Sequence, residues 1–447
     1  MNRDAIVALD KAHVWHPYTA MRVYLDEVDP LVVTRAQGAH LIDADGKRYI
    51  DGNASWWATT LGHRHPRVLA ALARQAAELD HCALAGIAHE PAAALAAELC
   101  ATLPPQLSRV FYTDDGSTAI EAAVKMCVQH WVARGAPKKS RFVALEGAFH
   151  GETIGATSLG GVEVFRRPFA SVVFDCVHVP FPALGDADAH ASAFTALRAI
   201  VERERDSIAA VVVEPILQGA AGMRTYAPSY LVELRDLCDR MDVLLVFDEV
   251  FAGYARTGPM WAAEHAGAWP DLMCVGKAFA QIVPMGAVVV SDRVFDTFSR
   301  DRETAFHYGH TFCGNPIGAA IAREVLAIYK EEDVLGQVAA KSKTMARAME
   351  RVARIDGVRR VRSIGMACAA DLGEPERDAT SAGESLEEAG YLGNIGWRVY
   401  RNALKRGAYV RPLGDTVYLC PPLTIDERDL DELLAIFEES ISESRHH

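Results

Sequence analysis

The sequence has no run of apolar residues long enough to span a membrane, and its first residues lack the apolar core of a signal peptide. Its nine cysteines are odd in number and scattered without any CxxC pair, which argues against disulfide frameworks and zinc clusters. Acidic residues outnumber basic ones, 59 to 46, so no basic surface for nucleic acid or anionic lipid is indicated. We therefore expect a cytoplasmic protein that binds no nucleic acid, membrane or metal.

Two enzyme signatures are also missing. No Gly-x-x-x-x-Gly-Lys-Ser/Thr loop is present, which excludes a P-loop nucleotide hydrolase, and no His-Glu-x-x-His cluster supports a metallohydrolase. What is present is a chain of 447 residues that is 50% hydrophobic and 23% charged, a composition typical of globular proteins. This length predicts more than one domain.

The pattern along the chain predicts three segments. Residues 1–65 contain short strand patterns around a turn at 43–46, and we expect them to contribute to a small domain. In residues 66–332, helical patterns alternate with apolar strand candidates, which predicts a large domain with a mainly parallel sheet. The strand candidates are 109–113, 141–145, 209–214, 243–248 and 272–276. Residues 333–447 predict a C-terminal small domain, with a long surface loop at 373–388.

Ligands of open α/β sheets bind beyond the carboxyl ends of strands, and two such ends suggest binding groups. Gly116 and Ser117 follow one strand candidate and open a helical pattern, so their amides could bind a phosphate, although an ordinary capped turn has the same pattern. Phe149, between Gly147 and Gly151, could stack on a planar ring or serve as a core aromatic.

Two further strand ends carry groups suited to pyridine-ring chemistry. Asp248, and less clearly Glu249, ends an apolar strand where a carboxylate could pair with a protonated pyridine nitrogen. An acidic pair at a strand end can also cap a helix or bind a metal. Lys277 ends the next strand, where desolvation favours the neutral amine needed for a Schiff base, although a lone lysine is more often a solvated charge.

These four pieces occur in the order found in pyridoxal 5′-phosphate (PLP) enzymes of fold type I, and the chain closely resembles class III aminotransferases over nearly its whole length. Family-like segments include 51–53, 62–66, 213–216, 248–258, 270–277 and 309–316. The resemblance implies a seven-stranded, mainly parallel sheet in a large domain, a smaller α+β domain built from both termini, and catalytic roles for Lys277 and Asp248. It implies a PLP site made of Gly116, Ser117, Phe149, His150, Glu214, Asp248, Val250, Lys277, His310 and Thr311.

In that family Thr311 would reach the phosphate of the neighbouring subunit's cofactor, which implies a homodimer with shared active sites. Three further segments, 14–21, 54–58 and 410–422, resemble the adenosylmethionine–8-amino-7-oxononanoate aminotransferases of biotin synthesis. By this resemblance Arg411 would pair with the substrate carboxylate, since a guanidinium fork suits that task. The implied substrate-binding residues are Tyr18, Trp56, Trp57, Arg256 at the edge of the site, Gly309, Arg411 and Tyr418.

Two departures from this pattern concern the amino donor. Members that use adenosylmethionine generally carry Tyr where this chain has Phe149, and the segment after Lys277, with Pro284-Met285-Gly286, resembles ω-aminotransferases. We expect transamination of 8-amino-7-oxononanoate to 7,8-diaminononanoate with adenosylmethionine as donor. The alternatives are a lysine-dependent version of this reaction, an ω-amino acid:pyruvate aminotransferase, a PLP-dependent aminomutase and a non-catalytic PLP-binding protein.

Overall fold

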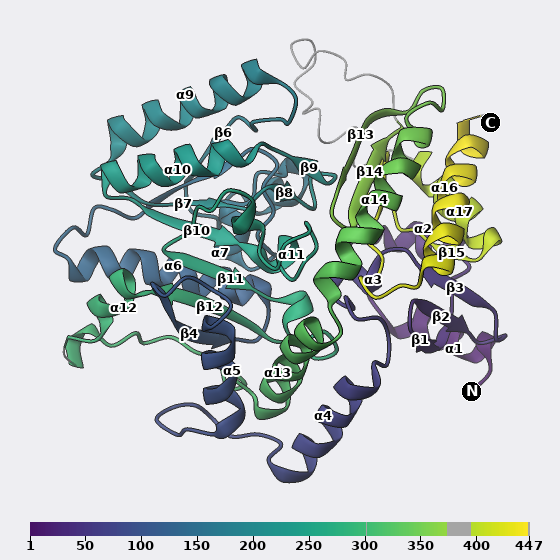
Figure 1. The fold of residues 1–447 in the computed structure, drawn as a ribbon, viewed down its shortest axis with the longest axis horizontal. Coiled ribbons are helices and arrows are strands. Elements are labelled where there is room, and N and C mark those ends of the chain that lie inside the picture. The colour runs from purple at the N-terminus through teal and green to yellow at the C-terminus, as the bar shows by residue number, and fades with distance from the viewer. Residues whose placement is uncertain (301, 373–394, 446–447) are drawn as a thin grey trace.

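A seven-stranded sheet forms the centre of the larger of two units in the computed structural model, which describes residues 1–300, 302–372 and 395–445 (Figure 1). The strands lie in the order β4 (Leu107–Thr113), β12 (Gly286–Ser291), β11 (Leu272–Val275), β10 (Leu244–Asp248), β7 (Ile208–Val213), β5 (Arg141–Leu145) and β6 (Cys176–Val179). Strand β12 runs antiparallel to both of its neighbours, and the other strand pairs of this sheet are parallel. The predicted mainly parallel sheet is confirmed, and β6 and β12 are strands that are absent from the predicted candidates.

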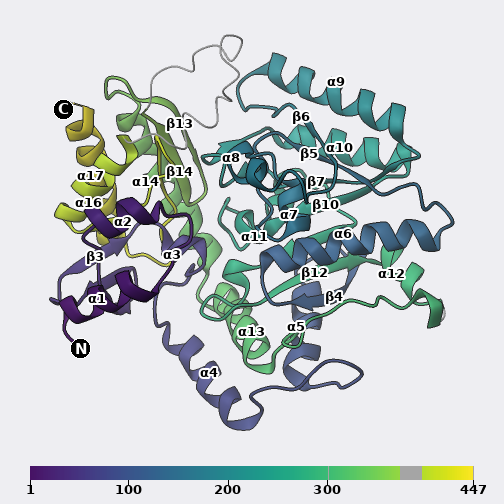
Figure 2. The same cartoon turned by 180° about the vertical axis from the view of Figure 1, so that it is seen from behind.

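Helices cover both faces of this sheet (Figures 1 and 2). One face packs against α9 (Ala187–Glu204) and α10 (Pro228–Met241), and the other against α6 (Gly116–Ala133) and α12 (Asp292–Phe298). Alternate residues of β5 divide between the two cores: Val143 and Leu145 join the first, Phe142 and Ala144 the second. Strands buried on both faces need apolar side chains throughout, which explains the continuous apolar runs in the sequence.

Shorter elements complete the larger unit. Helix α13 (Pro316–Glu331) packs against α4 (Pro66–Glu78) and α5 (Glu90–Cys100). The remaining elements are α7 (Ile154–Leu159), α8 (Glu163–Arg166), α11 (Glu249–Ala252), η1 (Arg167–Phe169), η2 (Ala262–His265), η3 (Lys277–Phe279), η4 (Arg302–Thr304) and the two-stranded pair β8 (Leu217–Gln218) and β9 (Arg224–Thr225).

The smaller unit joins the two ends of the chain. Its first sheet has the order β1 (Val33–Gln37), β2 (His40–Asp43), β3 (Arg48–Asp51) and β15 (Ala408–Tyr409), and β15 runs parallel to β3. A second sheet contains β13 (Arg359–Ile364), β14 (Ala367–Asp371) and β16 (Thr416–Leu419). The surrounding helices are α1 (Arg3–His13), α2 (Met21–Glu27), α3 (Ala54–Trp57), α14 (Val334–Val352), α16 (Ile395–Arg406) and α17 (Glu427–Arg445). A small α+β unit built from both termini is thus confirmed.

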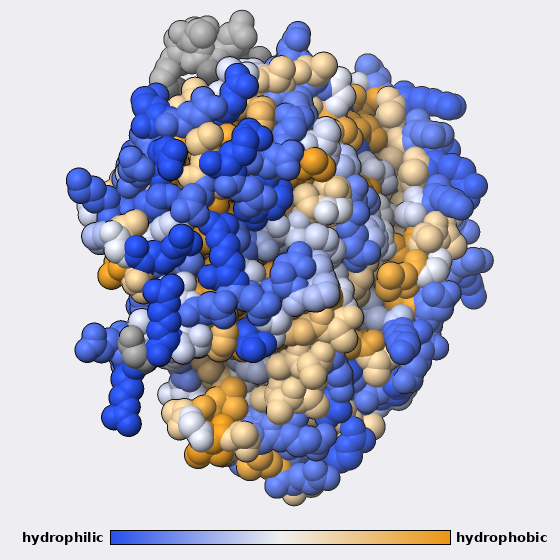
Figure 3. All heavy atoms as spheres, turned by 60° about the vertical axis from the view of Figure 1, so that its left-hand side comes forward, coloured by the Kyte–Doolittle hydropathy of each residue, from blue (hydrophilic) through white to orange (hydrophobic). Residues whose placement is uncertain are grey.

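The domain boundaries placed after residues 65 and 332 remain a prediction, and the loop predicted at 373–388 lies outside the described residues. Within the described ranges, no helix is both long and apolar enough to cross a lipid bilayer. On the face shown in Figure 3, hydrophilic residues cover most of the surface and hydrophobic ones form smaller groups between them.

Candidate active site

The turn from β4 into α6 carries the predicted phosphate-binding residues. Asp115 caps the helix: its carboxylate accepts a hydrogen bond from the Thr118 amide at 2.8 Å, and its own amide donates to the Thr118 hydroxyl at 2.9 Å. The first amides of a helix have no partner inside it, so those of Gly116 and Ser117 can bind an anion. A Cβ at Gly116 would lie 2.6 Å from Cγ1 of Val250, so only glycine fits this turn without displacing its neighbour.

A second turn, after β5, packs directly on the first. Gly151 has a φ of +121°, and a Cβ there would lie 2.2 Å from Oγ of Ser117. This close approach lets the Glu152 amide donate to Ser117 Oγ at 3.3 Å. The amide of Phe149 in the same turn donates to Glu214 Oε2 at 3.1 Å. Ser117, Phe149 and Glu214 are therefore brought to one edge of the sheet, as the strand-end argument predicts for Ser117 and Phe149 and the family resemblance implies for Glu214.

A buried acid–imidazole pair lies at the end of β10. Asp248 Oδ2 is 2.8 Å from Nδ1 of His150, and Asp248 Oδ1 accepts a hydrogen bond from the Val250 amide at 3.0 Å. Both side chains are nearly inaccessible to solvent. Burial alone lowers the pKa of His150, but the hydrogen bond and negative charge of Asp248 outweigh it and raise that pKa above its usual value. The pair thus keeps a carboxylate oriented in a site shielded from solvent.

Glu214 adds a second buried carboxyl group near this pair. Its oxygens accept hydrogen bonds from the amides of Phe149 at 3.1 Å and Gly219 at 2.9 Å. Burial raises its pKa to about 7, although the positive charge of His150 opposes that shift. Near neutral pH Glu214 therefore exists in both protonation states.

Lys277 follows β11, the strand that pairs with β10 beside Asp248. Its φ is 46°, a left-handed conformation that costs free energy in a non-glycine residue and persists only where the surroundings fix it. Burial lowers the pKa of its amine, although the nearby charges of Asp248 and Glu214 oppose this. Nζ lies 5.1 Å from the centre of the Trp57 ring. Burial thus shifts the amine towards its neutral, nucleophilic form.

The two neighbouring tryptophans of α3 sit on an unusual backbone. Residues 54–57 all have positive φ, from 45° to 75°, so this short helix is left-handed. Asp51 holds it in place by accepting hydrogen bonds from the amide and hydroxyl of Ser55 at 2.8 and 2.9 Å. Trp57 is buried, whereas Trp56 is 40% exposed. The strained turn thus directs one indole inward and leaves the other accessible.

Aromatic rings surround Trp57 on the inner side. Its ring lies 4.3 Å from that of Phe251, and its Nε1 donates to the buried Tyr418 hydroxyl at 3.3 Å. Since Lys277 Nζ also lies over this ring, Trp57 and Tyr418 join the lysine pocket. Their rings form part of the apolar wall beside the Lys277 amine.

Trp56 connects two polar residues that the sequence places far apart. The Tyr18 ring meets it edge-on at 5.4 Å, and the Tyr18 hydroxyl hydrogen-bonds the carboxylate of Glu152. The Arg411 guanidinium lies 5.0 Å from the Trp56 ring centre, and the Arg411 amide donates to Asn53 Oδ1 at 2.6 Å. Sequence reasoning gave neither Glu152 nor Asn53 a role in the site, although Asn53 belongs to a family-like segment, because only the folded chain brings them beside Tyr18 and Arg411.

Arg256 is placed differently from the expectation. It is 1% exposed, and its Nη1 donates to the carbonyl oxygens of Met366 at 2.8 Å and Pro421 at 2.9 Å. Through Nη1 the arginine joins the larger unit to the smaller one, while its Nη2 is buried without a hydrogen-bond partner among the described residues. The Glu249 carboxylate binds the backbone: it accepts hydrogen bonds from the amides of Ala262 at 3.0 Å and Ala263 at 2.8 Å, at the start of η2.

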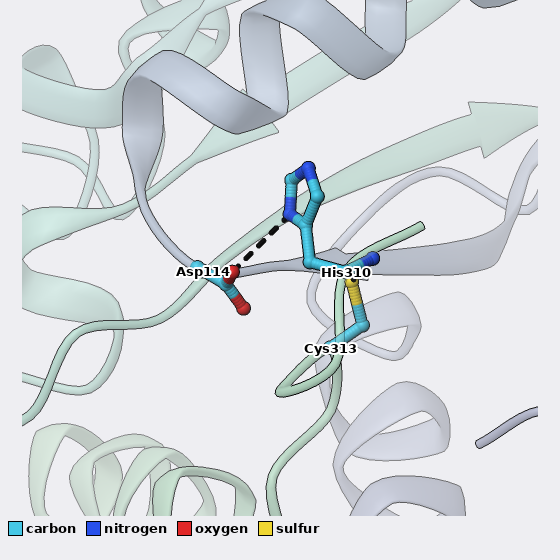
Figure 4. A group of neighbouring side chains, drawn as sticks. All are labelled: Asp114, His310 and Cys313. Atoms are coloured by element: carbon cyan, nitrogen blue, oxygen red, sulfur yellow. Dashed lines mark hydrogen bonds and ion pairs between the residues drawn. The ribbon is translucent and has the colours of Figure 1, made fainter. Parts of the chain in front are cut away.

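The segment at 309–313 lies beside the β4–α6 turn (Figure 4). His310 Nδ1 is 3.3 Å from Asp114 Oδ2, one residue before the Asp115 cap. Gly309 and Thr311 are exposed in the single chain. The structure therefore brings His310 to the phosphate turn, and leaves Thr311 free to face a neighbouring molecule.

The donor set at this edge fits PLP. The amides at the start of α6 suit a phosphate group, Asp248 supplies a buried carboxylate, and Lys277 supplies a primary amine. His150 Nε2 is buried and has no hydrogen-bond partner among the described residues, an arrangement that a bound polar group would explain. The phosphate, ring nitrogen and aldehyde of PLP are thus matched by the α6 amides, Asp248 and Lys277, respectively.

Comparisons with known proteins agree with this geometry. The family model described as aminotransferase class III matches residues 23–441. The adenosylmethionine-8-amino-7-oxononanoate aminotransferase of Geobacter sulfurreducens is 37% identical, over 97% of this chain and 96% of its own. The crystal structure of the enzyme with that name from Methanocaldococcus jannaschii is 29% identical, with a TM-score of 0.91 over 99% of both chains.

A further solved structure is the omega transaminase from Pseudomonas jessenii in complex with PMP. It is 28% identical and has a TM-score of 0.90 over 99% of this chain and 98% of that one. The match to the family model spans most of the chain, and both named activities are transaminations. This chain belongs to the class III aminotransferase family.

Proposed function

We propose that this protein is a PLP-dependent aminotransferase that converts 8-amino-7-oxononanoate to 7,8-diaminononanoate in biotin synthesis, with S-adenosylmethionine as the amino donor. The observation that carries the proposal is the position of Arg411, whose guanidinium lies over Trp56, next to the pocket of Trp57 and Lys277. This arrangement provides an apolar wall for an aliphatic chain and a cation for its terminal carboxylate. The names of the relatives support the same substrate.

Bound PLP supplies an electron sink for the carbon that loses or gains the amino group. The α6 amides of Gly116 and Ser117 would hold its phosphate, and Asp248, oriented by His150, would pair with its protonated pyridine nitrogen. Lys277 would hold the cofactor through Nζ, and its free amine would move the proton at the substrate carbon. Trp57 and Tyr418 keep water away from that nitrogen.

A second candidate differs only in the donor. The Phe149 ring offers no hydroxyl to an adenosylmethionine donor, an observation that favours lysine. An ω-amino acid:pyruvate aminotransferase is the third reading, supported by the similarity to the Pseudomonas jessenii omega transaminase.

The protein works as a homodimer in this proposal, with Thr311 of each chain reaching the neighbouring subunit's phosphate site. Exposure of Thr311 and Gly309 in the single chain supports this assembly. We further place the enzyme in the cytoplasm, since each of its nine cysteines is a free thiol. The division into segments 1–65, 66–332 and 333–447 belongs to the same proposal.

Single-turnover absorbance spectra test the function. The holoenzyme is mixed separately with S-adenosylmethionine, lysine, β-alanine and 7,8-diaminononanoate, and conversion of the cofactor to its amino form is recorded. Conversion by diaminononanoate together with adenosylmethionine is the expected result, and conversion by lysine in its place identifies the second candidate. Conversion by β-alanine without diaminononanoate overturns the biotin-pathway assignment.

A further inference from the structure

Three side chains beside the phosphate turn bring together an oxygen, a nitrogen and a sulfur atom: Asp114, His310 and Cys313 (Figure 4). One ligand atom from each lies within 4.8 Å of the other two. Nδ1 of His310 is already 3.3 Å from Oδ2 of Asp114. Residues from two distant parts of the chain thus form one donor cluster, in which all three side chains are partly buried.

The ligand atoms are oriented by their own neighbours. His310 Nε2 lies 2.9 Å from the Tyr308 hydroxyl, so the tautomer that donates there leaves the Nδ1 lone pair directed at Asp114. The His310 amide donates to Cys313 Sγ at 3.1 Å. Outer hydrogen bonds of this kind fix the ligands of metal sites.

Two of these atoms are buried without a hydrogen bond of ordinary geometry. Oδ1 of Asp114 has no hydrogen-bond partner among the described residues, and Nδ1 of His310 has none either, although it lies at an ion-pair distance of 3.3 Å from Asp114 Oδ2. Buried polar atoms are nearly always hydrogen-bonded, so this arrangement needs an explanation. A cation bound between them would supply it.

We propose that Asp114, His310 and Cys313 bind one Zn²⁺ ion per chain. Zinc takes nitrogen, sulfur and carboxylate oxygen in a tetrahedral shell with bonds of about 2.0–2.3 Å, which places ligand atoms roughly 3.3–3.6 Å apart. The histidine–aspartate separation already matches, and the thiol, which lies within 4.8 Å of the other two ligand atoms, reaches this spacing with a shift of at most about 1.5 Å. Thiolate and imidazole disfavour Mg²⁺ and Ca²⁺, and three protein ligands leave one position for water.

The location gives this site a consequence for the active centre. His310 and Cys313 flank Thr311, and Asp114 directly precedes Asp115, the cap of α6. A bound ion therefore fastens the 310–313 segment to the phosphate turn of its own chain. Zinc occupancy sets the position of Thr311 relative to that turn.

The test uses holoenzyme freed of unbound PLP and chelators, with Zn²⁺ alone as the probe. Equilibrium dialysis measures zinc per chain, and iodoacetamide labelling followed by peptide mass spectrometry measures the accessibility of individual thiols. We expect one zinc per chain and more than about tenfold slower alkylation of Cys313 with zinc, reversed by a chelator. Cys100, another partly buried thiol outside the cluster, serves as the internal control.

Three variants complete the design. Asp114→Asn, which keeps the side-chain shape, and Cys313→Ser are each expected to weaken zinc binding by more than about tenfold. Cys100→Ser is expected to retain one zinc per chain. Circular dichroism verifies that each variant is folded. The proposal is overturned if the wild-type protein retains no zinc, if Cys313→Ser retains it equally well, or if zinc protects Cys100 as much as Cys313.

Discussion

Replacing Arg411 by alanine tests how the enzyme recognises its acceptor. The Arg411 guanidinium lies 5.0 Å from the Trp56 ring centre and 5.9 Å from that of Trp397. The Arg411 amide is held by Asn53, so the backbone position should survive truncation of the side chain. The substitution therefore removes the cation while leaving the lysine pocket in place.

The size of the effect follows from the bonds that are lost. A hydrogen bond to a charged group contributes about 1.5–3 kcal/mol, so a bidentate pair with a carboxylate contributes roughly 3–6 kcal/mol. At about 1.4 kcal/mol for each factor of ten, kcat/KM for 8-amino-7-oxononanoate should fall about 10²–10⁴-fold. Arg411→Lys keeps a point charge without the fork, and a loss of about tenfold is expected.

The assay compares the two half-reactions separately. Arg411→Ala should impair the half-reaction with 8-amino-7-oxononanoate. The half-reaction with an amine donor that lacks the terminal carboxylate of the oxononanoate should stay within about threefold of wild type. Arg406→Ala is the matched control, because Arg406 lies on α16 and pairs with Glu439 and Glu443 at 3.2 and 2.8 Å. Equal losses in both half-reactions, or full activity with the oxononanoate, would refute the carboxylate role.

Three further predictions concern the cofactor site. Lys277→Ala should lower kcat by at least about 10³-fold with an unchanged circular dichroism spectrum, since the variant lacks the group that transfers the proton; wild-type turnover would contradict this. Gly116→Ala should weaken PLP binding at least about tenfold, because its Cβ would lie 2.6 Å from Val250 Cγ1, and an unaltered cofactor dissociation constant would be the opposing result. Glu214 has a pKa raised to about 7, so the folded apoprotein retains a proton that the unfolded chain releases above about pH 4.5. The contribution of Glu214 to the free energy of unfolding should therefore fall by roughly 3 kcal/mol as the pH rises from 4.5 to 7. Denaturant titrations at pH 5, 6 and 7 should show that the free energy of unfolding depends less on pH in Glu214→Gln than in the wild type. The same pH dependence in both proteins would exclude the raised pKa of Glu214.

The large sheet could be predicted because its strands are buried on both faces. Strand candidates at 109–113, 141–145 and 243–248 agree with β4, β5 and β10 within two residues at each end. Strand β12 could not be placed in the same way, since nothing in Gly286–Ser291 shows that it is antiparallel and lies between β4 and β11. Pairing between distant segments is a tertiary property that local pattern does not record.

Site residues were predictable where a strand end or a family motif places them. Asp248, Lys277 and Gly116 lie where the strand-end argument puts them, at one edge of the sheet. The burial of Arg256 was not predictable, because the carbonyl oxygens that hold it belong to Met366 and Pro421 in the smaller unit. The donor cluster around Cys313 was also invisible: its spacing in the sequence matches no metal motif, and the sequence led us to expect no metal.

The pairing of β3 with β15 constrains how the protein is made. Asn53 and Arg411, which are joined beside these strands, lie 358 residues apart. At a synthesis rate of roughly 5–20 residues per second, β3 waits about 20–70 s for its partner strand. During that interval the larger unit can fold while one edge of the first sheet stays open to other chains. Asn53 and Trp56 wait equally long for Arg411, so the proposed acceptor site forms only near the end of translation.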